Sequence, residues 1–279
     1  MKTYKQILTF VCIAIMIPVM GQDEEDKGKR PARPAFESQV VIDNQTIKIP
    51  TKNTLVWNIQ HRFGSMQNGY SDLIGFYAPS NIKLHFTYSV LDRLNLGVGL
   101  TKFGHVLDLS AKYKILTQTR DNSMPISMAY FALAGIDQRN VDFVKSVHRL
   151  SYYHQLMIAR RLSPKLSLQL SAGYSHFNAV DSLLSNDMIG VGMLGRFKVS
   201  GSGSVVFDYT QPVTQHDDLV TAKPNIALGY EIATSSHAFQ IFLTNYQKIL
   251  PQYNLHFSEN NWSLEGLFIG FNITRLWNF

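Results

Sequence analysis

Residues 166–175 read Leu-Ser-Leu-Gln-Leu-Ser-Ala-Gly-Tyr-Ser, with an apolar residue at each even position and a polar or small one at each odd position. Successive side chains of a β-strand point to opposite faces, so this alternation predicts a strand with one apolar and one polar face. The same period recurs in about twelve segments, although 147–161 alternates less regularly: 54–63, 82–90, 94–103, 106–116, 125–136, 147–161, 166–176, 188–200, 204–210, 224–233, 237–245 and 265–278.

The connections between these segments differ in length in a largely regular way, with exceptions at 103–106, which is short on the side of the long loops, and 117–124, which is long on the side of the short turns. Short turns such as 91–93, 163–165, 201–203 and 234–236 alternate with longer polar loops at 64–81, 137–146, 177–187, 211–223 and 246–264. Short turns at one end and long loops at the other are typical of bacterial outer-membrane barrels. The chain therefore predicts a transmembrane antiparallel up-and-down β-barrel of about twelve strands over residues 51–279, with both termini in the periplasm.

The last predicted strand carries a row of apolar side chains on one face. Phe271, Ile273, Trp277 and the terminal Phe279 share that face, and only Arg275 interrupts it. An outward apolar row that ends in aromatic residues suits the closing strand of a membrane barrel. The row also resembles the C-terminal signal of outer-membrane barrels, which implies recognition by the barrel-assembly machinery.

The composition excludes several other classes of protein. Of the 279 residues, 16% are charged, against about 25% in an ordinary soluble domain. The mean hydropathy of −0.06 fits a chain whose strands present only one face to lipid. Its aromatic and aliphatic content excludes disorder for most of its length, and the absence of repeated long apolar runs excludes a helical membrane bundle. A single cysteine, Cys12, excludes a disulfide scaffold.

The N-terminus is predicted to direct export. Residues 1–21 combine two lysines, an apolar run and a small residue at position 21, which predicts a signal peptide cleaved after Gly21. Cys12 lies inside the apolar run and would leave with it. Residues 22–50 begin with a charged, proline-containing stretch and are predicted to form a flexible periplasmic segment.

The polar faces of the strands predict the residues that line the lumen. The candidates are Arg62, Lys83, His85, Asp108, Lys112, Arg196, Asp208 and Glu231. Basic residues outnumber acidic ones, which favours a narrow channel for anions. The alternative is that Arg62, Lys112 and Arg196 pair with Asp108, Asp208 and Glu231 and close the lumen. The sequence leaves both open.

The sequence predicts no catalytic residues, cofactor or metal. His216-Asp217-Asp218 is a short cluster of a kind that occurs often by chance, and no serine is placed beside an outward histidine such as His61 or His176 for a lipid hydrolase. The scattered basic residues and the export signal argue against nucleic acid, despite a pI of about 9.3.

Four segments resemble a known family. They are His61-Arg62-Phe63-Gly64, 150–160 (Leu-Ser-Tyr-Tyr-His-Gln-Leu-Met-Ile-Ala-Arg), 237–245 (His-Ala-Phe-Gln-Ile-Phe-Leu-Thr-Asn) and 270–275 (Gly-Phe-Asn-Ile-Thr-Arg). In this order they resemble a family of uncharacterised outer-membrane β-barrel proteins from Bacteroidota, over roughly residues 38–279. The family's usual Gly-Gly is Ser235-Ser236 here. The resemblance implies a barrel in the outer membrane and no particular activity.

Two functions are therefore expected, both non-enzymatic. The first is a narrow channel for small anionic solutes. The second is a structural or partner-binding barrel with a plugged lumen, which would meet a periplasmic or surface protein through the 23–50 segment or the loops 211–223 and 246–264. A barrel lipid hydrolase or a soluble secreted β-protein is a weaker alternative.

Overall fold

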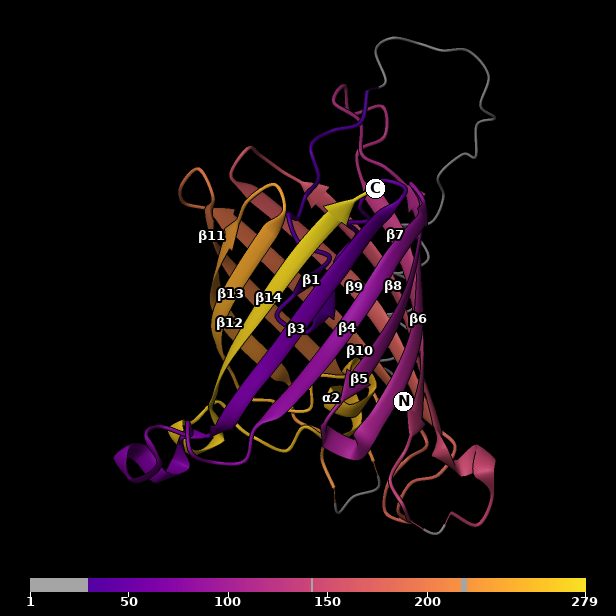
Figure 1. The fold of residues 1–279 in the computed structure, drawn as a ribbon, viewed down its shortest axis with the longest axis vertical. Coiled ribbons are helices and arrows are strands. Elements are labelled where there is room, and N and C mark those ends of the chain that lie inside the picture. The colour runs from indigo at the N-terminus through magenta and orange to yellow at the C-terminus, as the bar shows by residue number, and fades with distance from the viewer. Residues whose placement is uncertain (1–29, 142, 217–219) are drawn as a thin grey trace, which may run out of the picture.

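The computed structural model describes residues 30–141, 143–216 and 220–279. Twelve antiparallel strands form one closed barrel, in the order β10-β11-β12-β13-β14-β3-β4-β5-β6-β7-β8-β9 (Figure 1). The strands are β3 (Thr54–Ser65), β4 (Asn81–Leu91), β5 (Leu94–Thr101), β6 (Val106–Leu116), β7 (Ser127–Asp137), β8 (Leu150–Arg161), β9 (Leu166–Phe177), β10 (Asp187–Lys198), β11 (Gly203–Pro212), β12 (Asn225–Ala233), β13 (His237–Thr244) and β14 (Phe268–Asn278). This confirms the predicted fold class.

The barrel closes between its first and last strands. β14 pairs with β3 from Phe268 opposite Ser65 to Asn278 opposite Thr54. Neighbouring strands elsewhere are consecutive in sequence, so the chain runs up and down around the wall. Closure removes the free edges that an open sheet would expose, which a membrane barrel requires because lipid cannot hydrogen-bond to unpaired backbone groups.

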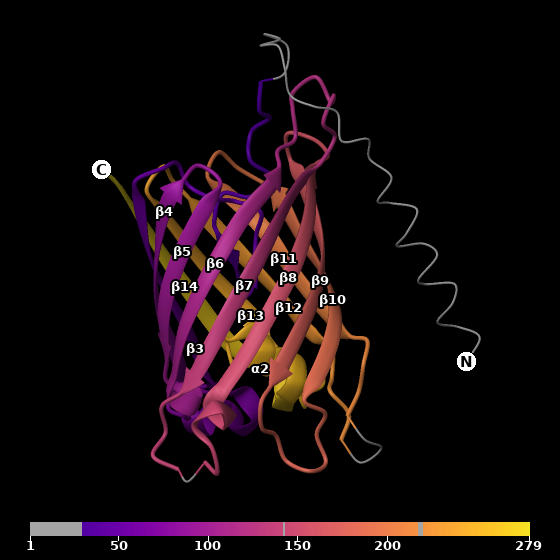
Figure 2. The ribbon, with the colours of Figure 1, turned by 90° about the vertical axis from the view of Figure 1, so that its right-hand side faces the viewer.

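The two ends of the barrel differ. One end, which we call the turn end, carries the C-terminus and mostly short connections (Figures 1 and 2). The opposite loop end carries the long connections and their short helices: η1 (Met66–Asp72), η2 (Phe103–His105), η3 (Ser146–Arg149), α2 (Pro251–Phe257) and η4 (Leu264–Gly266). None of the helices in the described ranges is long and apolar enough to cross a membrane.

The strands present apolar side chains outward and polar side chains inward. Leu170 and Ile241, for example, are about three-fifths exposed (61% and 62%) on the outer wall, whereas Gln169 and Gln240 beside them are buried in the interior. The doubled tyrosines of β8 follow the same rule, because Tyr152 lies partly exposed outside and Tyr153 is buried inside. Part of the interior is apolar, because Phe131, Met157 and Leu194 also point inward and are buried. An apolar exterior around a mostly polar interior is the arrangement of a membrane barrel.

The N-terminal segment differs from its prediction as a flexible periplasmic tail. Residues 35–50 enter the lumen from the turn end and form a two-stranded hairpin of β1 (Val40–Val41) and β2 (Asn44–Gln45) (Figure 1). We call residues 35–50 the plug. Phe36, Val41 and Ile42 of the plug are fully buried. The prediction was wrong for these residues because it extended the charged character of the stretch before Ala35 to the apolar segment that follows. Apolar side chains such as these are stabilised by burial.

The other N-terminal residues divide at position 30. Residues 30–34 run along the turn end, where Ala32 donates its amide to the Gln118 carbonyl at 2.8 Å and Pro31 bridges Thr119. Residues 22–29 lie outside the described residues, as does the predicted signal peptide, 1–21.

Candidate functional site

The interior of the barrel collects the charged residues that alternation singled out. Each of them comes from a different position on the wall and is at most 5% exposed: Arg62, Lys83, His85, Asp108, Lys112, Arg196, Asp208 and Glu231. Their placement inside follows from the two-residue period of each strand. Their function stays a prediction. Their hydrogen-bond and ion-pair partners, described next, show which segments of the chain fill the lumen.

The tip of the plug is held by an ion pair and by wall amides. Arg62 of β3 pairs with Asp43, and both side chains are almost completely buried. Gln60 donates to the same carboxylate at 2.8 Å, and Asn272 donates to the Ile42 carbonyl at 2.6 Å. Ile42 has a positive φ of 58°, a left-handed conformation that costs energy for a β-branched residue. Contacts from the neighbouring strands β3 and β14 therefore hold a strained hairpin turn.

Glu231 of β12 joins wall and plug in a second cluster. Its carboxylate lies 3.3 Å from Arg196 Nε of β10 and accepts the hydroxyl of Ser38 at 2.6 Å. Gln240 of β13 donates to this carboxylate at 2.8 Å and to the Val40 carbonyl at 3.0 Å. Each oxygen of a buried carboxylate thus has a partner, which offsets the cost of removing the charge from water.

Lys112 and Asp208 bind the plug from other sides of the lumen. The Lys112 ammonium donates to three plug carbonyls, those of Gln39 and Thr46 at 3.1 Å and that of Lys48 at 3.3 Å. Asp208 accepts from Asn44 Nδ2 at 2.7 Å. A lysine has three donors, so three carbonyls satisfy it completely.

The three remaining candidates have partners within the wall. Lys83 Nζ lies 3.0 Å from Asp108, and His85 Nε2 lies 3.3 Å from the Ser110 hydroxyl. A Cβ at Gly99 would collide with the Asp108 carboxylate, so this glycine makes room for the pair. Of the predicted pairings between Arg62, Lys112 or Arg196 and the wall acids, only Arg196 with Glu231 is found. The sequence did not indicate that Arg62 and Lys112 bind the plug instead of the wall acids.

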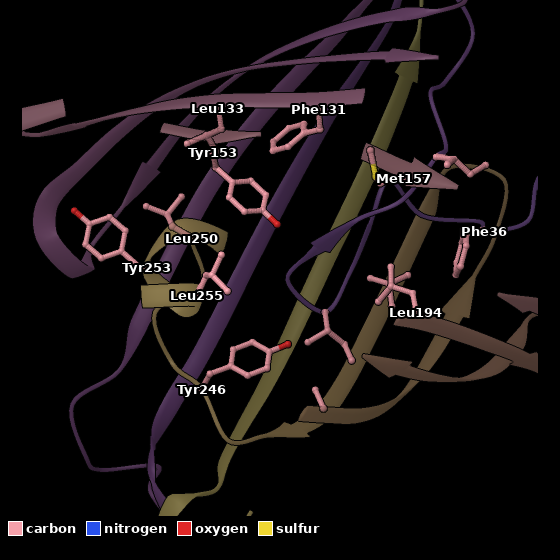
Figure 3. Close-up of a cluster of buried hydrophobic side chains, with 14 of the residues drawn as sticks. Phe36, Phe131, Leu133, Tyr153, Met157, Leu194, Tyr246, Leu250, Tyr253 and Leu255 are labelled. Atoms are coloured by element: carbon pink, nitrogen blue, oxygen red, sulfur yellow. The ribbon is translucent and has the colours of Figure 1, made fainter. Parts of the chain in front are cut away.

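A second element enters the lumen from the loop end. Helix α2 packs against β8, β9 and β10, with Gln252, Leu255 and His256 buried. Figure 3 shows Tyr246, Leu250, Tyr253 and Leu255 of this connection gathered around Tyr153 and Leu133 of the wall. The Asn254 amide comes within 3.5 Å of Asp43, so α2 and the plug meet inside the barrel. The prediction placed this segment in an outer loop, 246–264, because seven residues are too short to show a helical period.

His216 links helix α2 to the loop that contains Ser185. Its Nδ1 accepts from the Ser185 amide at 3.0 Å, and its Nε2 donates to the His256 carbonyl at 2.7 Å. Burial lowers the pKa of His256 to about 4, so this imidazole is neutral at physiological pH. Asp217 and Asp218 lie outside the described residues, and the described part of the chain brings no three metal-binding side chains together.

The closing strand presents its aromatic side chains outward as its alternation predicts. Phe271 stacks on His61 with ring centroids 4.9 Å apart, and the guanidinium of Arg275 lies 4.9 Å from the Trp277 ring centroid. Ile273 is partly exposed beside them, and Phe279 is 80% exposed. Arg275 thus lies against an aromatic ring near the turn end, where a lipid-facing arginine costs about 0–1 kcal/mol.

Comparison with known proteins gives a family. Residues 36–277 match the family described as "Membrane bound beta barrel domain (DUF5777)". The chain belongs to this family. The match begins at Phe36, so it includes the plug together with the wall. No curated protein matches the sequence.

Solved structures with the same fold are distant in sequence. The COG4313 outer membrane channel from Pseudomonas putida F1 is 13% identical, with a TM-score of 0.50 over 82% of this chain and 97% of that one. The NanC porin is 9% identical, with a TM-score of 0.50 over 80% of this chain and 98% of that one. At such identities the likeness extends to the fold alone. The protein is a membrane β-barrel.

Proposed function

We propose that the protein is a non-enzymatic outer-membrane channel for small anionic solutes, closed in the described state by its own plug. The observation that carries the proposal is the set of contacts by which the charged wall holds residues 35–50. A permanently filled lumen could be packed with apolar residues, at a lower desolvation cost than these buried charged and polar groups. A polar wall suits an aqueous lumen once the plug has left.

The proposed orientation follows from the two ends of the barrel. Outer-membrane barrels have short turns in the periplasm and long loops outside. The turn end, with Phe279 and the entry of the plug, would then face the periplasm, as an exported chain with a signal peptide over residues 1–21 requires. Its origin in Bacteroidota remains an expectation from the resemblance of its motifs.

The preference for anions rests on the charges that the plug covers. Four basic wall residues, Arg62, Lys83, Lys112 and Arg196, face three acidic ones, Asp108, Asp208 and Glu231. The plug adds Asp43 against Arg62 and Glu37 against Arg196. Withdrawal of the plug would therefore remove acidic partners and uncover guanidinium groups in the lumen, where they attract anions.

Ion selectivity tests this proposal. In a chain from which residues 30–49 are deleted, the reversal potential in a potassium chloride gradient is expected to have the sign of anion selectivity. Lys112→Glu in that background should shift it towards cations, because the change adds a negative charge to the lumen wall. Lys145→Glu, in an exposed loop, is the matched control and should change it little. A cation-selective or unselective lumen would refute the anion channel.

A partner-binding barrel with a permanently plugged lumen is the second candidate. It is favoured by α2, which fills part of the lumen from the loop end and touches the plug at Asp43. A lipid hydrolase has less support, because the outward His61 is packed between Phe63 and Phe271, with ring centroids 4.6 and 4.9 Å away. We therefore propose no enzymatic activity.

We also propose that the barrel-assembly machinery recognises the closing strand. Phe279 is 80% exposed, so it adds little to the packing of the barrel. Phe279→Ser is expected to lower the amount of folded protein in the outer membrane of cells, while the purified variant refolds in detergent like the wild type. Heat-modifiable gel mobility measures both. Equal loss in cells and in detergent would assign Phe279 to stability and contradict recognition.

A further inference from the structure

The outer wall over β7 to β10 carries a connected row of polar aromatic side chains. The Tyr130 hydroxyl lies 2.6 Å from His154 Nδ1. The Tyr174 hydroxyl donates to Asp187 at 2.5 Å, and His176 Nδ1 lies 2.8 Å from the same carboxylate oxygen. His154 stacks between Tyr130 and Tyr174, and His176 stacks on Tyr152, with ring centroids 6.0–6.3 Å apart. We call the row the outer ladder: Tyr130, Tyr152, His154, Tyr174, His176 and Asp187.

The outer ladder reaches into the part of the wall that meets hydrocarbon. His154 lies four residues from Leu150, where β8 begins at the loop end, or about 13 Å along the strand. With a strand tilt of about 40°, this is roughly 10 Å along the barrel axis below the loop-end start of β8, in a wall whose apolar band is about 25 Å tall. Ionisable groups at such depth are costly and almost always have a partner. The ladder satisfies part of this requirement internally.

Each imidazole keeps one nitrogen for an external partner. Nδ1 of His154 is bonded to the Tyr130 hydroxyl, and Nδ1 of His176 is bonded to the Asp187 carboxylate. The hydrogen bonds of the ladder use neither Nε2 atom. Each Nε2 can therefore donate or accept a hydrogen bond, according to the tautomer of its ring, with whatever covers the face.

Small residues lie beside the ladder. Ala132 is opposite His154 and Ala134 is opposite Tyr152 on β7, and the exposed Ala172 of β9 is opposite Leu156. The outer face of β13, by contrast, carries the bulky apolar residues Phe239, Ile241 and Leu243. Small side chains that allow close approach, together with polar groups that hydrogen-bond across, characterise contacts between proteins inside membranes.

We propose that the outer ladder is the interface of a homodimer, in which the same face of a second copy covers it. An imidazole nitrogen that can either donate or accept is able to bond to its own counterpart in a second copy, as an isologous twofold contact requires. Two copies inserted in one direction present their ladders at the same depth. Lipid is a poorer occupant, because acyl chains bring no hydrogen-bonding group to the depth of His154. The interface does not depend on whether the lumen conducts.

Cysteine crosslinking in outer membranes tests the dimer. With the signal-peptide residue Cys12 changed to alanine, Ala132→Cys provides one thiol beside the ladder in the full-length chain. The matched control is Ile241→Cys, which is also on the outer wall but five strands further round the barrel from β8. Oxidation is expected to give several-fold more crosslinked dimer for Ala132→Cys. Adding His154→Leu should reduce that yield, and unchanged heat-modifiable mobility shows that the barrels are folded.

Two results would overturn the homodimer. One is a crosslinking yield for Ala132→Cys no higher than for Ile241→Cys. The other is a monomer in native mass spectrometry that carries an amphiphile lost in the His154→Leu variant, which would make the ladder a lipid site.

Discussion

The variant Arg62→Met is expected to lose about 3–5 kcal/mol of the free energy of unfolding, because it leaves the Asp43 carboxylate buried without its cation. Arg62 has no exposed surface, and the Asp43 side chain is 3% exposed. The carboxylate is therefore almost completely shielded from bulk solvent while the plug is in place. The same guanidinium also lies 4.2 Å from the ring centroid of Phe242 and donates to the His61 carbonyl at 2.8 Å. The variant therefore loses contacts to the plug and to the wall together.

The double variant Asp43→Leu/Arg62→Met separates these effects. Because it removes both charges, it should recover much of the loss, since a buried pair replaced by apolar residues is often close to neutral. Arg139→Met is the control: Arg139 pairs with Asp137 near the loop end but is 49% exposed, so about 0–1 kcal/mol is expected. Urea unfolding in detergent, followed by tryptophan fluorescence, measures all three. Equal losses for Arg62→Met and Arg139→Met would contradict a buried pair between wall and plug.

The wall of the barrel could be predicted because its information is local. The alternation of 166–176 needs no distant residue to assign β9, and the same alternation places Arg62 or Lys112 inside. Closure could be predicted from the outward row of Phe271 and Ile273. A period of two residues fixes the face of every side chain once a segment is known to be a strand.

The contents of the lumen could not be predicted because their contacts are long-range. Ser38 meets Glu231 across 193 residues, and β1 and β2 have two residues each, too few to show a period. The available signal was the apolar run Val40-Val41-Ile42 inside a supposed solvated tail. Such a run needs a hydrophobic partner, but the sequence does not say which surface provides it.

Removal of residues 30–49 is expected to convert a silent barrel into a conducting one. The plug binds Arg62, Lys112 and Glu231 on separate strands, so its contacts span the lumen. Once it is gone, these polar groups would be hydrated. Helix α2 makes most of its contacts with β8, β9 and β10, which is one side of the wall. On the side of β3 and β4 the same connection is held by Gln247, which accepts from Asn81 Nδ2 at 2.9 Å and donates to the Phe63 carbonyl at 3.2 Å. An aqueous path through the space left by the plug is the expected result.

A tethered plug provides the matched control for this deletion. Asn44 Nδ2 lies 3.2 Å from the Thr210 hydroxyl of β11, so cysteines at these two positions can be joined by a short thiol-specific crosslinker. The tethered full-length chain should stay silent under every condition that releases the plug. Heat-modifiable mobility shows that the deletion variant and the tethered chain both form folded barrels.

Single-channel conductance in planar bilayers tests the claim that the plug closes the lumen. The account predicts no steps for the full-length or tethered chain and discrete steps for the folded chain without residues 30–49. Steps of equal size with and without the plug, or a silent lumen in both, would contradict it.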